Sequence, residues 1–339
     1  MTAQANTPKT ARNNAVDIFR LVCAMLVVCV HTQLFYEINA NLNYFCTKIF
    51  PRIVMPFFFS VSGYYFIGSL ISGEKVYIRY LKKLLIVYSL WSIIYFSLTF
   101  FNLIVLNHQP ITDFIKQCAL NFFIYGSYYQ LWFFPAIFLS ATITTICYKL
   151  KIIKWLVCFS LFLYIVGCLG CSYYTIGNRI PVISGFINST HFDLIRRYLL
   201  TGLPFFLLGY FLNTIRIKKD KKLIAIFIIT AIIYLAEIFY VVKTGLQENI
   251  SLTLFLYPLA TMIIICLINN PLPKFIIFGK RARTTANFMF YSHPIFILLL
   301  EKLFNLSGTP LFLLVVLLTG ASGFMIAYIN KKWINIFIA

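Results

Sequence analysis

The sequence predicts an all-α membrane protein, and two observations carry this prediction. Of its 339 residues, 61% are hydrophobic and only 11% are charged, whereas soluble domains are about half apolar and about a quarter charged. The apolar residues also come in runs of the length that a helix needs to cross a bilayer, about 20 residues. A soluble globule of this size has too little interior for so many apolar side chains. An ordinary cytosolic enzyme is therefore excluded, and a polytopic helix bundle is expected.

The apolar runs define about ten spanning helices. The first run is too long for a signal-peptide core and should remain as the first helix. The sixth is the weakest, because it is short and contains Gly202, Pro204 and Gly209. The helices are expected near residues 15–36, 49–71, 84–106, 130–148, 152–172, 199–214, 223–242, 250–268, 286–304 and 309–330.

The charge balance orients this bundle. The chain has 29 Lys and Arg against 9 Asp and Glu, a net charge of +20. With the N-terminus inside, about 20 basic residues fall in cytoplasmic segments and about eight in outer ones, as expected for membrane proteins. The predicted organisation is a cytoplasmic tail (1–14), a transmembrane domain (15–330) and a cytoplasmic end (331–339). Orientation accounts for the excess charge, so we expect membrane lipid and no nucleic acid as a partner.

Searches for well-known motifs exclude several classes of enzyme. The chain contains no phosphate-binding loop, dinucleotide fingerprint, hydrolase elbow or zinc-protease motif. The nine cysteines lie mostly in apolar runs and form no zinc-binding pattern. His191 and Asp193 on an outer segment are too short a pattern to predict a metal site. We therefore expect no bound metal.

The first helix carries three ionisable residues, which are costly in a bilayer and usually face the bundle interior. Asp17 and Arg20 are three residues apart, so they share a face. Arg20 and His31 lie on one stripe, roughly 16 Å apart along the axis. Arg20 would lie near the cytoplasmic surface, where it can also extend to lipid headgroups. His31 would lie in the outer half, where a functional role is favoured.

Three other segments combine polar and small residues inside predicted helices. In the second helix, Ser60, Ser62 and Gly63 follow a proline, which is typical of a kinked surface that lets another helix approach closely. Gln130 and Trp132 begin the fourth helix, where an aromatic residue can serve as an interfacial anchor. His293 precedes Pro294 in the ninth helix. Composition alone favours a packing role for all three segments.

Together these motifs resemble the acyltransferase 3 family of integral membrane acyltransferases. The resemblance rests on Arg20 and His31 in the first helix, on Phe58-Phe59-x-x-Ser62-Gly63-Tyr64 in the second and on Arg79-x-x-Lys82 in the following inner loop. Leu131-Trp132-Phe133 at the start of the fourth helix adds to it. The order and spacing match across nearly the whole chain. The resemblance implies transfer of an acyl group, usually acetyl from cytoplasmic acetyl-CoA, to a hydroxyl of a cell-envelope carbohydrate or a related small acceptor.

The resemblance also implies roles for individual residues. His31 would match the family's essential histidine, and a histidine that titrates near neutral pH suits the removal of a proton from the acceptor hydroxyl. Arg20 would match the motif arginine. With Arg79, Lys82 and Lys83 it would hold the phosphates of the acyl-CoA donor. Apart from the resemblance, outer residues 173–198 are the longest polar stretch on that face and are expected to form a lid over the acceptor or to contact it. The location implied is the plasma membrane of a bacterium, which the chain crosses several times.

Two departures from the sugar acetyltransferases make the chain similar to the membrane domain of VanT-type serine racemases. Gln130 stands where many members have a histidine, and no proline follows Lys82 and Lys83. The alternative function is therefore binding or transport of L-serine. The sequence ends soon after the tenth predicted helix, so we expect no racemase domain and no pyridoxal phosphate in it. A transporter would be expected to show internal repeats, and their absence from the sequence favours the enzyme.

Overall fold

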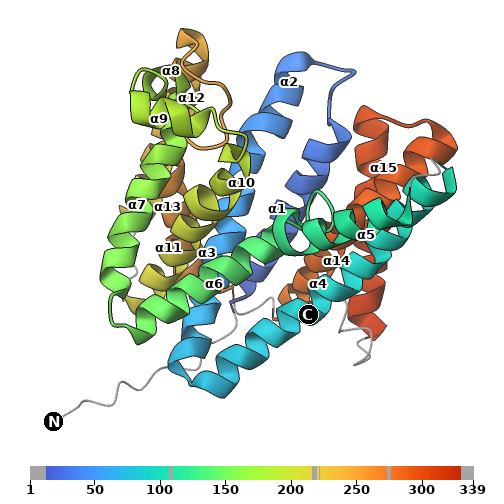
Figure 1. The fold of residues 1–339 in the computed structure, drawn as a ribbon, viewed down its shortest axis with the longest axis horizontal. Helices are drawn as coiled ribbons and strands as arrows, with labels where there is room; N and C mark the ends of the chain where they lie inside the picture. Colours follow the sequence, from blue (N-terminus) through green and yellow to red (C-terminus); the bar gives the residue numbers. More distant parts are fainter. Residues whose placement is uncertain (1–12, 107–109, 216–219, 221, 273–275, 330–339) are drawn as a thin grey trace.

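The computed structural model describes residues 13–106, 110–215, 220, 222–272 and 276–329, and the regular elements in these ranges are helices (Figure 1). The predicted all-α class is confirmed for this part of the chain. Five helical stretches are long and apolar enough to cross a membrane: Asn14–Thr32, Ala40–Ile71, Lys75–Phe100, Lys222–Thr244 and Gly308–Ile329. The protein is thus a multi-pass membrane protein, while the number of about ten crossings and the sides of the termini stay predictions.

Each predicted apolar run contains at least one helix. The long elements are α1 (Asn14–Thr32), α3 (Val54–Ile71), α4 (Glu74–Phe100), α6 (Phe133–Lys149), α7 (Ile153–Leu169), α11 (Leu203–Thr214), α12 (Lys222–Thr244), α13 (Leu256–Asn269), α14 (Ile276–Phe304) and α15 (Gly308–Ile329). Shorter elements connect them: α2 (Ala40–Tyr44), η1 (Phe45–Ile49), η2 (Phe50–Ile53), η3 (Phe101–Leu106), α5 (Ile111–Leu120), η4 (Asn121–Tyr125), α8 (Tyr174–Gly177), α9 (Pro181–Ile187), α10 (Phe192–Ile195) and η5 (Arg196–Gly202).

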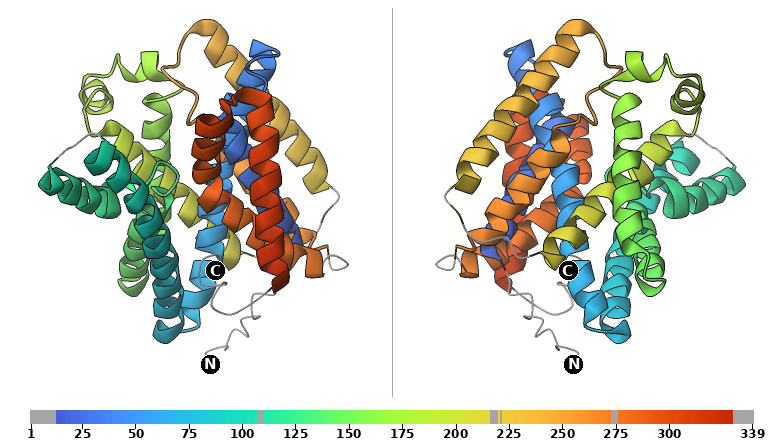
Figure 2. Two further views of the ribbon diagram at one scale, coloured as in Figure 1. Left: turned by 90° about the vertical axis from the view of Figure 1, so that its right-hand side faces the viewer. Right: turned by 90° about the vertical axis from the view of Figure 1, so that its left-hand side faces the viewer.

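Helices α1, α14 and α15 form one side of the bundle, as Figure 2 shows. The side chain of Asn14 lies against Gly279 near the start of α14, and Gly323 near the end of α15 lies against Thr285. The start of α1 and the end of α15 therefore lie at the same end of α14. The last described helix thus returns to the end of α14 where the first begins, and the side of the membrane on which the termini lie stays a prediction.

Asn13 fixes the start of α1. Its side-chain oxygen accepts hydrogen bonds from the backbone N–H groups of Ala15 and Val16, which have no partner within the helix. Its amide also donates to the carbonyl oxygens of Leu267 and Ile268 at the end of α13. One side chain thus caps α1 and ties it to α13, so α1 is held in a defined position in the bundle.

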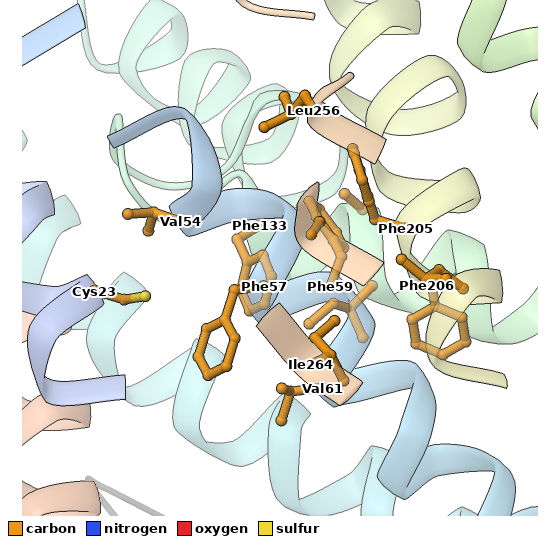
Figure 3. Packing of buried hydrophobic residues seen from close by; sticks show 14 of the residues in the cluster. Cys23, Val54, Phe57, Phe59, Val61, Phe133, Phe205, Phe206, Leu256 and Ile264 are labelled. Carbon is orange, nitrogen blue, oxygen red and sulfur yellow. The ribbon is translucent and has the colours of Figure 1, made fainter. Parts of the chain in front are cut away.

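Aromatic side chains fill the centre of the bundle between α3, α6, α11 and α13 (Figure 3). Phe57 and Phe59 of α3 are buried, and Phe59 packs against Phe133 of α6 with ring centroids 4.8 Å apart. Phe205 and Phe206 of α11 are fully buried on the other side. Such rings bury large apolar areas, and their edge-to-face contacts add about 1 kcal/mol per pair. The core therefore places α3 at the centre.

The backbones of α3 and α11 touch where glycine replaces a side chain. A methyl group added to Gly63 would lie 1.9 Å from the carbonyl oxygen of Phe206, and one added to Gly209 would lie 1.9 Å from that of Ser60. Close approach of this kind is the usual role of small residues between membrane helices. The packing role predicted for Ser60 and Gly63 is therefore observed.

Outside the predicted spans, Glu37 caps the N-terminus of α15. Its carboxylate accepts a hydrogen bond of 2.7 Å from the backbone N–H of Thr309, and Gly308 beside it has a φ of 60°. Hydrogen bonds from its own backbone N–H and from Thr309 hold the pKa of Glu37 below its ordinary value. The stabilisation should be present above a pH of about 4.3 and be lost as the pH falls through the lowered pKa. We expect thermal unfolding in detergent to show this acid loss in the wild type and not in Glu37→Gln, and equal acid sensitivity of the two would contradict the cap.

Candidate functional site

Two histidines from distant parts of the chain meet at one end of α1. The imidazole of His31 stacks on that of His293 of α14, with ring centroids 5.3 Å apart and an angle of 23° between the planes. Tyr129, in the loop before α6, lies against His31 at 4.4 Å. His31 is exposed, whereas His293 is fully buried. His31 therefore points toward other helices of the bundle and remains accessible from one side.

Pro294 explains how His293 is held. A proline has no N–H, so the carbonyl of Phe290 one turn earlier loses its usual helical partner. The Nδ1 of His293 lies 3.0 Å from this carbonyl oxygen and 3.1 Å from that of Met289. Because carbonyl oxygens only accept, Nδ1 carries the hydrogen, and Nε2 presents a lone pair in the neutral ring. That Nε2 is buried and has no hydrogen-bond partner among the described residues.

A second polar group supports α14 at the same place. The Nε2 of Gln130 donates to the carbonyl oxygen of Tyr291 at 3.2 Å, and the hydroxyl of Tyr95 donates to the same oxygen. Gln130 is 3% exposed, and its Oε1 has no partner within the described ranges. Gln130 and His293, which composition alone assigned to packing, thus belong to one polar cluster with His31. The packing role remains for Trp132, whose indole contacts Phe59 at 5.8 Å.

Arg20 lies among tyrosines toward the other end of α1. Its guanidinium lies 6.0 Å from the ring centroid of Tyr65 on α3. The hydroxyls of Tyr80 on α4 and Tyr291 on α14 are within its electrostatic range. The hydroxyl of Tyr80 also lies near the side chain of Ser62. The Nε of Arg20 is buried and makes no hydrogen bond in the part of the chain that the structure describes. Asp17 is buried one turn earlier in α1, and its carboxylate is within electrostatic range of Tyr65.

Further basic residues lie near Arg20. Lys83 of α4 and Arg283 of α14 are within electrostatic range of one another, and Tyr65 is within range of both Arg20 and Arg283. Three helices thus contribute a cation to one neighbourhood. Arg79 and Lys82 are exposed on α4, one turn apart and adjacent to Lys83 in sequence. The predicted donor-binding residues therefore lie at the end of α1 that is opposite to His31.

Sequence reasoning missed several residues of both clusters. Tyr129 and Tyr95 at the histidine end, and Tyr65 and Tyr80 at the arginine end, lay unnoticed among the 22 tyrosines of the chain. Position next to a chosen residue was the available signal, because Tyr129 precedes Gln130 and Tyr291 stands two residues before His293. No group of three or more His, Cys, Asp or Glu side chains that could hold a metal occurs among the residues searched, which are the described ones.

Comparison with known proteins places this geometry in a family. The family model described as an acyltransferase domain matches residues 13–329. An amino-acid racemase of Enterococcus faecalis is 28% identical over 311 residues, which are 86% of this chain and 42% of that protein. A serine/alanine racemase of Enterococcus gallinarum is 26% identical over 256 residues, 72% of this chain and 36% of its own length. The chain thus spans less than half the length of these curated relatives. No solved structure matches.

The family match covers nearly the whole described chain, including both polar clusters of α1. The resemblance seen in the motifs is confirmed by it, and so is the similarity to the membrane part of serine racemases. The apolar helices agree with a protein that crosses the membrane several times. This chain belongs to the acyltransferase domain family, which makes it an integral membrane protein of the acyltransferase class.

Proposed function

We propose that the protein transfers an acyl group, acetyl in the simplest case, from cytoplasmic acyl-CoA to a hydroxyl of a cell-envelope acceptor. One observation carries this proposal: cations from three helices gather near Arg20, a pair of imidazoles lies at His31, and these two residues of α1 are roughly 16 Å apart along its axis. The donor has an anionic phosphate end and a reactive thioester end. A donor bound at the cations can extend along α1 and bring its thioester toward the histidines.

His31 acts as the general base in this proposal. It takes the proton of the acceptor hydroxyl as the oxygen attacks the thioester carbonyl, the C–S bond breaks, and the proton then goes to the leaving CoA thiolate. His31 suits this role because it is accessible, while its ring is held by His293 and Tyr129. The lone pair of His293 Nε2 adds an acceptor that can bind the protonated ring or the substrate hydroxyl.

The cations near Arg20 bind the donor. Arginine binds phosphate through two parallel N–H donors, and Lys82, Lys83 and Arg79 add positive charge along the exposed face of α4. The guanidinium of Arg20 lies over the ring of Tyr65, and its Nε has no hydrogen-bond partner among the described residues, so it is available to bind a phosphate. In this proposal the arginine end faces the cytoplasm, as the distribution of basic residues predicts.

A second candidate function follows from the names of the relatives. Because two of them are racemases of amino acids, the membrane domain could bind or transport L-serine. Vesicles that contain the purified protein would distinguish the two functions. Serine uptake that does not depend on acetyl-CoA would favour transport, whereas acetyl transfer without serine uptake would favour the enzyme.

The donor site gives a first test. We expect Arg20→Gln to weaken acetyl-CoA binding about tenfold or more, because one charge-assisted hydrogen bond is removed. Binding should be measured with acetyl-labelled radioactive CoA ester and protein in nanodiscs, since the exposed and half-buried cysteines of the chain would react with thiol reagents. Lys154→Gln, which removes an exposed basic residue on α7, is the matched control. Equal donor affinity in Arg20→Gln and the wild type would show that Arg20 does not bind the donor.

A further inference from the structure

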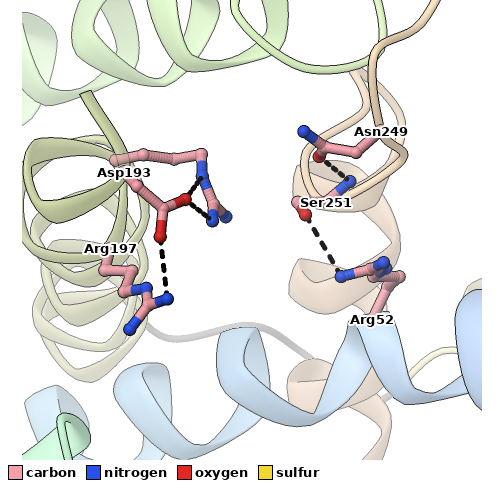
Figure 4. Close-up of polar contacts among 6 residues, drawn as sticks. Arg52, Asp193, Arg197, Asn249 and Ser251 are labelled. Carbon is pink, nitrogen blue, oxygen red and sulfur yellow. Dashed lines mark hydrogen bonds and ion pairs between the residues drawn. The ribbon is translucent and has the colours of Figure 1, made fainter. Parts of the chain in front are cut away.

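Three arginines gather near the histidine end of α1. Arg196 and Arg197 begin η5, and Arg52 lies in η2 before α3. Figure 4 shows Arg52 beside Ser251 on one side of the view, and Asp193 and Arg197 together on the other. Arg52 and Arg196 are close enough to act on each other electrostatically, and both act on the thiol of Cys171.

A single carboxylate is bonded to these arginines in the described structure. Asp193 accepts from Nη2 of Arg197 at 2.7 Å, and from Nε of Arg196 at 3.2 Å. Burial acts to raise the pKa of Asp193, but the hydrogen bonds and charges of both arginines outweigh it and hold the pKa below its ordinary value. Asp193 is therefore charged, and it balances one of the three cations.

Arg52 has only neutral partners among the described residues. Its Nε donates to the carbonyl oxygen of Lys48 at 2.9 Å, and its Nη1 donates to the hydroxyl of Ser251 at 3.2 Å. The acid of α12, Glu237, accepts instead from the hydroxyl of Tyr173 and from the backbone N–H groups of Leu254 and Phe255. A partly buried guanidinium beside a second one costs free energy unless an anion compensates it.

One of the three arginines and the histidine pair contact the same segment before α6. The guanidinium of Arg197 lies 5.8 Å from the ring centroid of Trp132, three residues after Tyr129, which contacts His31. The hydrogen bond from Leu131 N–H to the carbonyl of Tyr128 makes this segment a tight turn. The backbone between Tyr129 and Trp132 spans at most about 11 Å, so Arg197 and His31 contact side chains of one short turn.

We propose that Arg52, Arg196 and Arg197 form a binding site for an anionic group, a carboxylate or a phosphate, of the hydroxyl-bearing substrate that reacts at His31. The inference rests on the proposed function and adds the chemical class of the acceptor. Arg52 and Arg197 approach the anion from opposite sides, and Asp193 orients Arg196 and Arg197. The substrate hydroxyl then lies toward His31.

Radioactive L-serine and radioactive sn-glycerol 3-phosphate, both with a hydroxyl group, are the probes for this site. Neutral glycerol is the control ligand. Binding to the full chain in nanodiscs should be detected for at least one of the two probes, through its carboxylate or its phosphate, and should fall about tenfold or more in Arg52→Gln and in Arg197→Gln. Serine binding alone identifies a carboxylate acceptor, and glycerol phosphate binding alone identifies a phosphate acceptor.

Matched variants separate this proposal from the proposed function. Lys116→Gln removes an exposed basic residue of α5, which lies outside residues 173–198, and should bind the anion as the wild type does. His31→Ala should also bind it, because the base is not part of the anion site. Anion binding without any acetyl transfer would contradict the proposed acyltransferase function but would still support the anion site. Binding of neither anion, or undiminished binding in both arginine variants that elute as folded monodisperse protein, would overturn the site.

Discussion

Replacing His31 with alanine should abolish acyl transfer while acyl-CoA still binds. Removal of a general base typically lowers the rate by about 10²- to 10⁴-fold. The donor should remain bound because Arg20, Lys83 and Arg283 lie toward the other end of α1 and do not touch the imidazole pair. The measurement is single-turnover transfer of labelled acetyl to an acceptor, together with donor binding to the same preparation.

A histidine outside the pair provides the control for this experiment. His108 lies in sequence outside α1, α14 and residues 173–198, so His108→Ala removes the same side chain from a position with no proposed role. We expect transfer by this variant at the wild-type rate. If His31→Ala transferred acetyl as fast as His108→Ala, the imidazole pair would have no role in the chemistry. If both donor binding and transfer disappeared in His31→Ala, the substitution would have disturbed the fold.

The sequence was sufficient to predict the fold class because the bilayer imposes a simple rule. A spanning segment must be apolar over about 20 residues, and every predicted run contains a helix in the structure. The sequence did not predict where the helices depart from regular α-helical geometry. The segments η1, η3, η4 and η5 depart from α-helical geometry, and η5 with α11 replaces the short sixth run. Such departures depend on which neighbours supply hydrogen bonds, and one sequence does not reveal neighbours.

The candidate site was predictable only in part. The stripe of Arg20 and His31 follows from helical spacing within α1, and the structure places both residues in one continuous helix. His293 lies far from His31 in the sequence, so no spacing rule relates the two rings. The same applies to Arg52, which meets Ser251 and Arg196 only after α3, α11 and α13 have packed. Local patterns predicted the residues, and tertiary packing decided their partners.

Gly209→Ala should prevent stable folding, because α3 and α11 touch through their backbones. A Cβ atom at this position would lie 1.9 Å from the carbonyl oxygen of Ser60 and 2.6 Å from the backbone nitrogen of Tyr64. Neither atom belongs to a side chain that can rotate away, so the helices must separate. Separation would also loosen the ring contact of Phe59 with Phe133 next to Ser60. Overpacking typically costs about 1–3 kcal/mol, and a backbone clash lies at the upper end of this range or beyond it.

Thermal unfolding in detergent, followed by tryptophan fluorescence, measures this effect. The control is Gly185→Ala in α9, where an added Cβ meets no atom within 4 Å and alanine favours the helix. We expect an unchanged or slightly raised Tm for Gly185→Ala and a strongly lowered Tm, or no monodisperse protein, for Gly209→Ala. A Tm of Gly209→Ala equal to that of the wild type would mean that α3 and α11 are farther apart than the structure places them. The position of Arg52 would then be open to question as well. Arg52 lies in η2, just before α3, and the packing that buries Phe57 and Phe59 of α3 also sets the direction of η2.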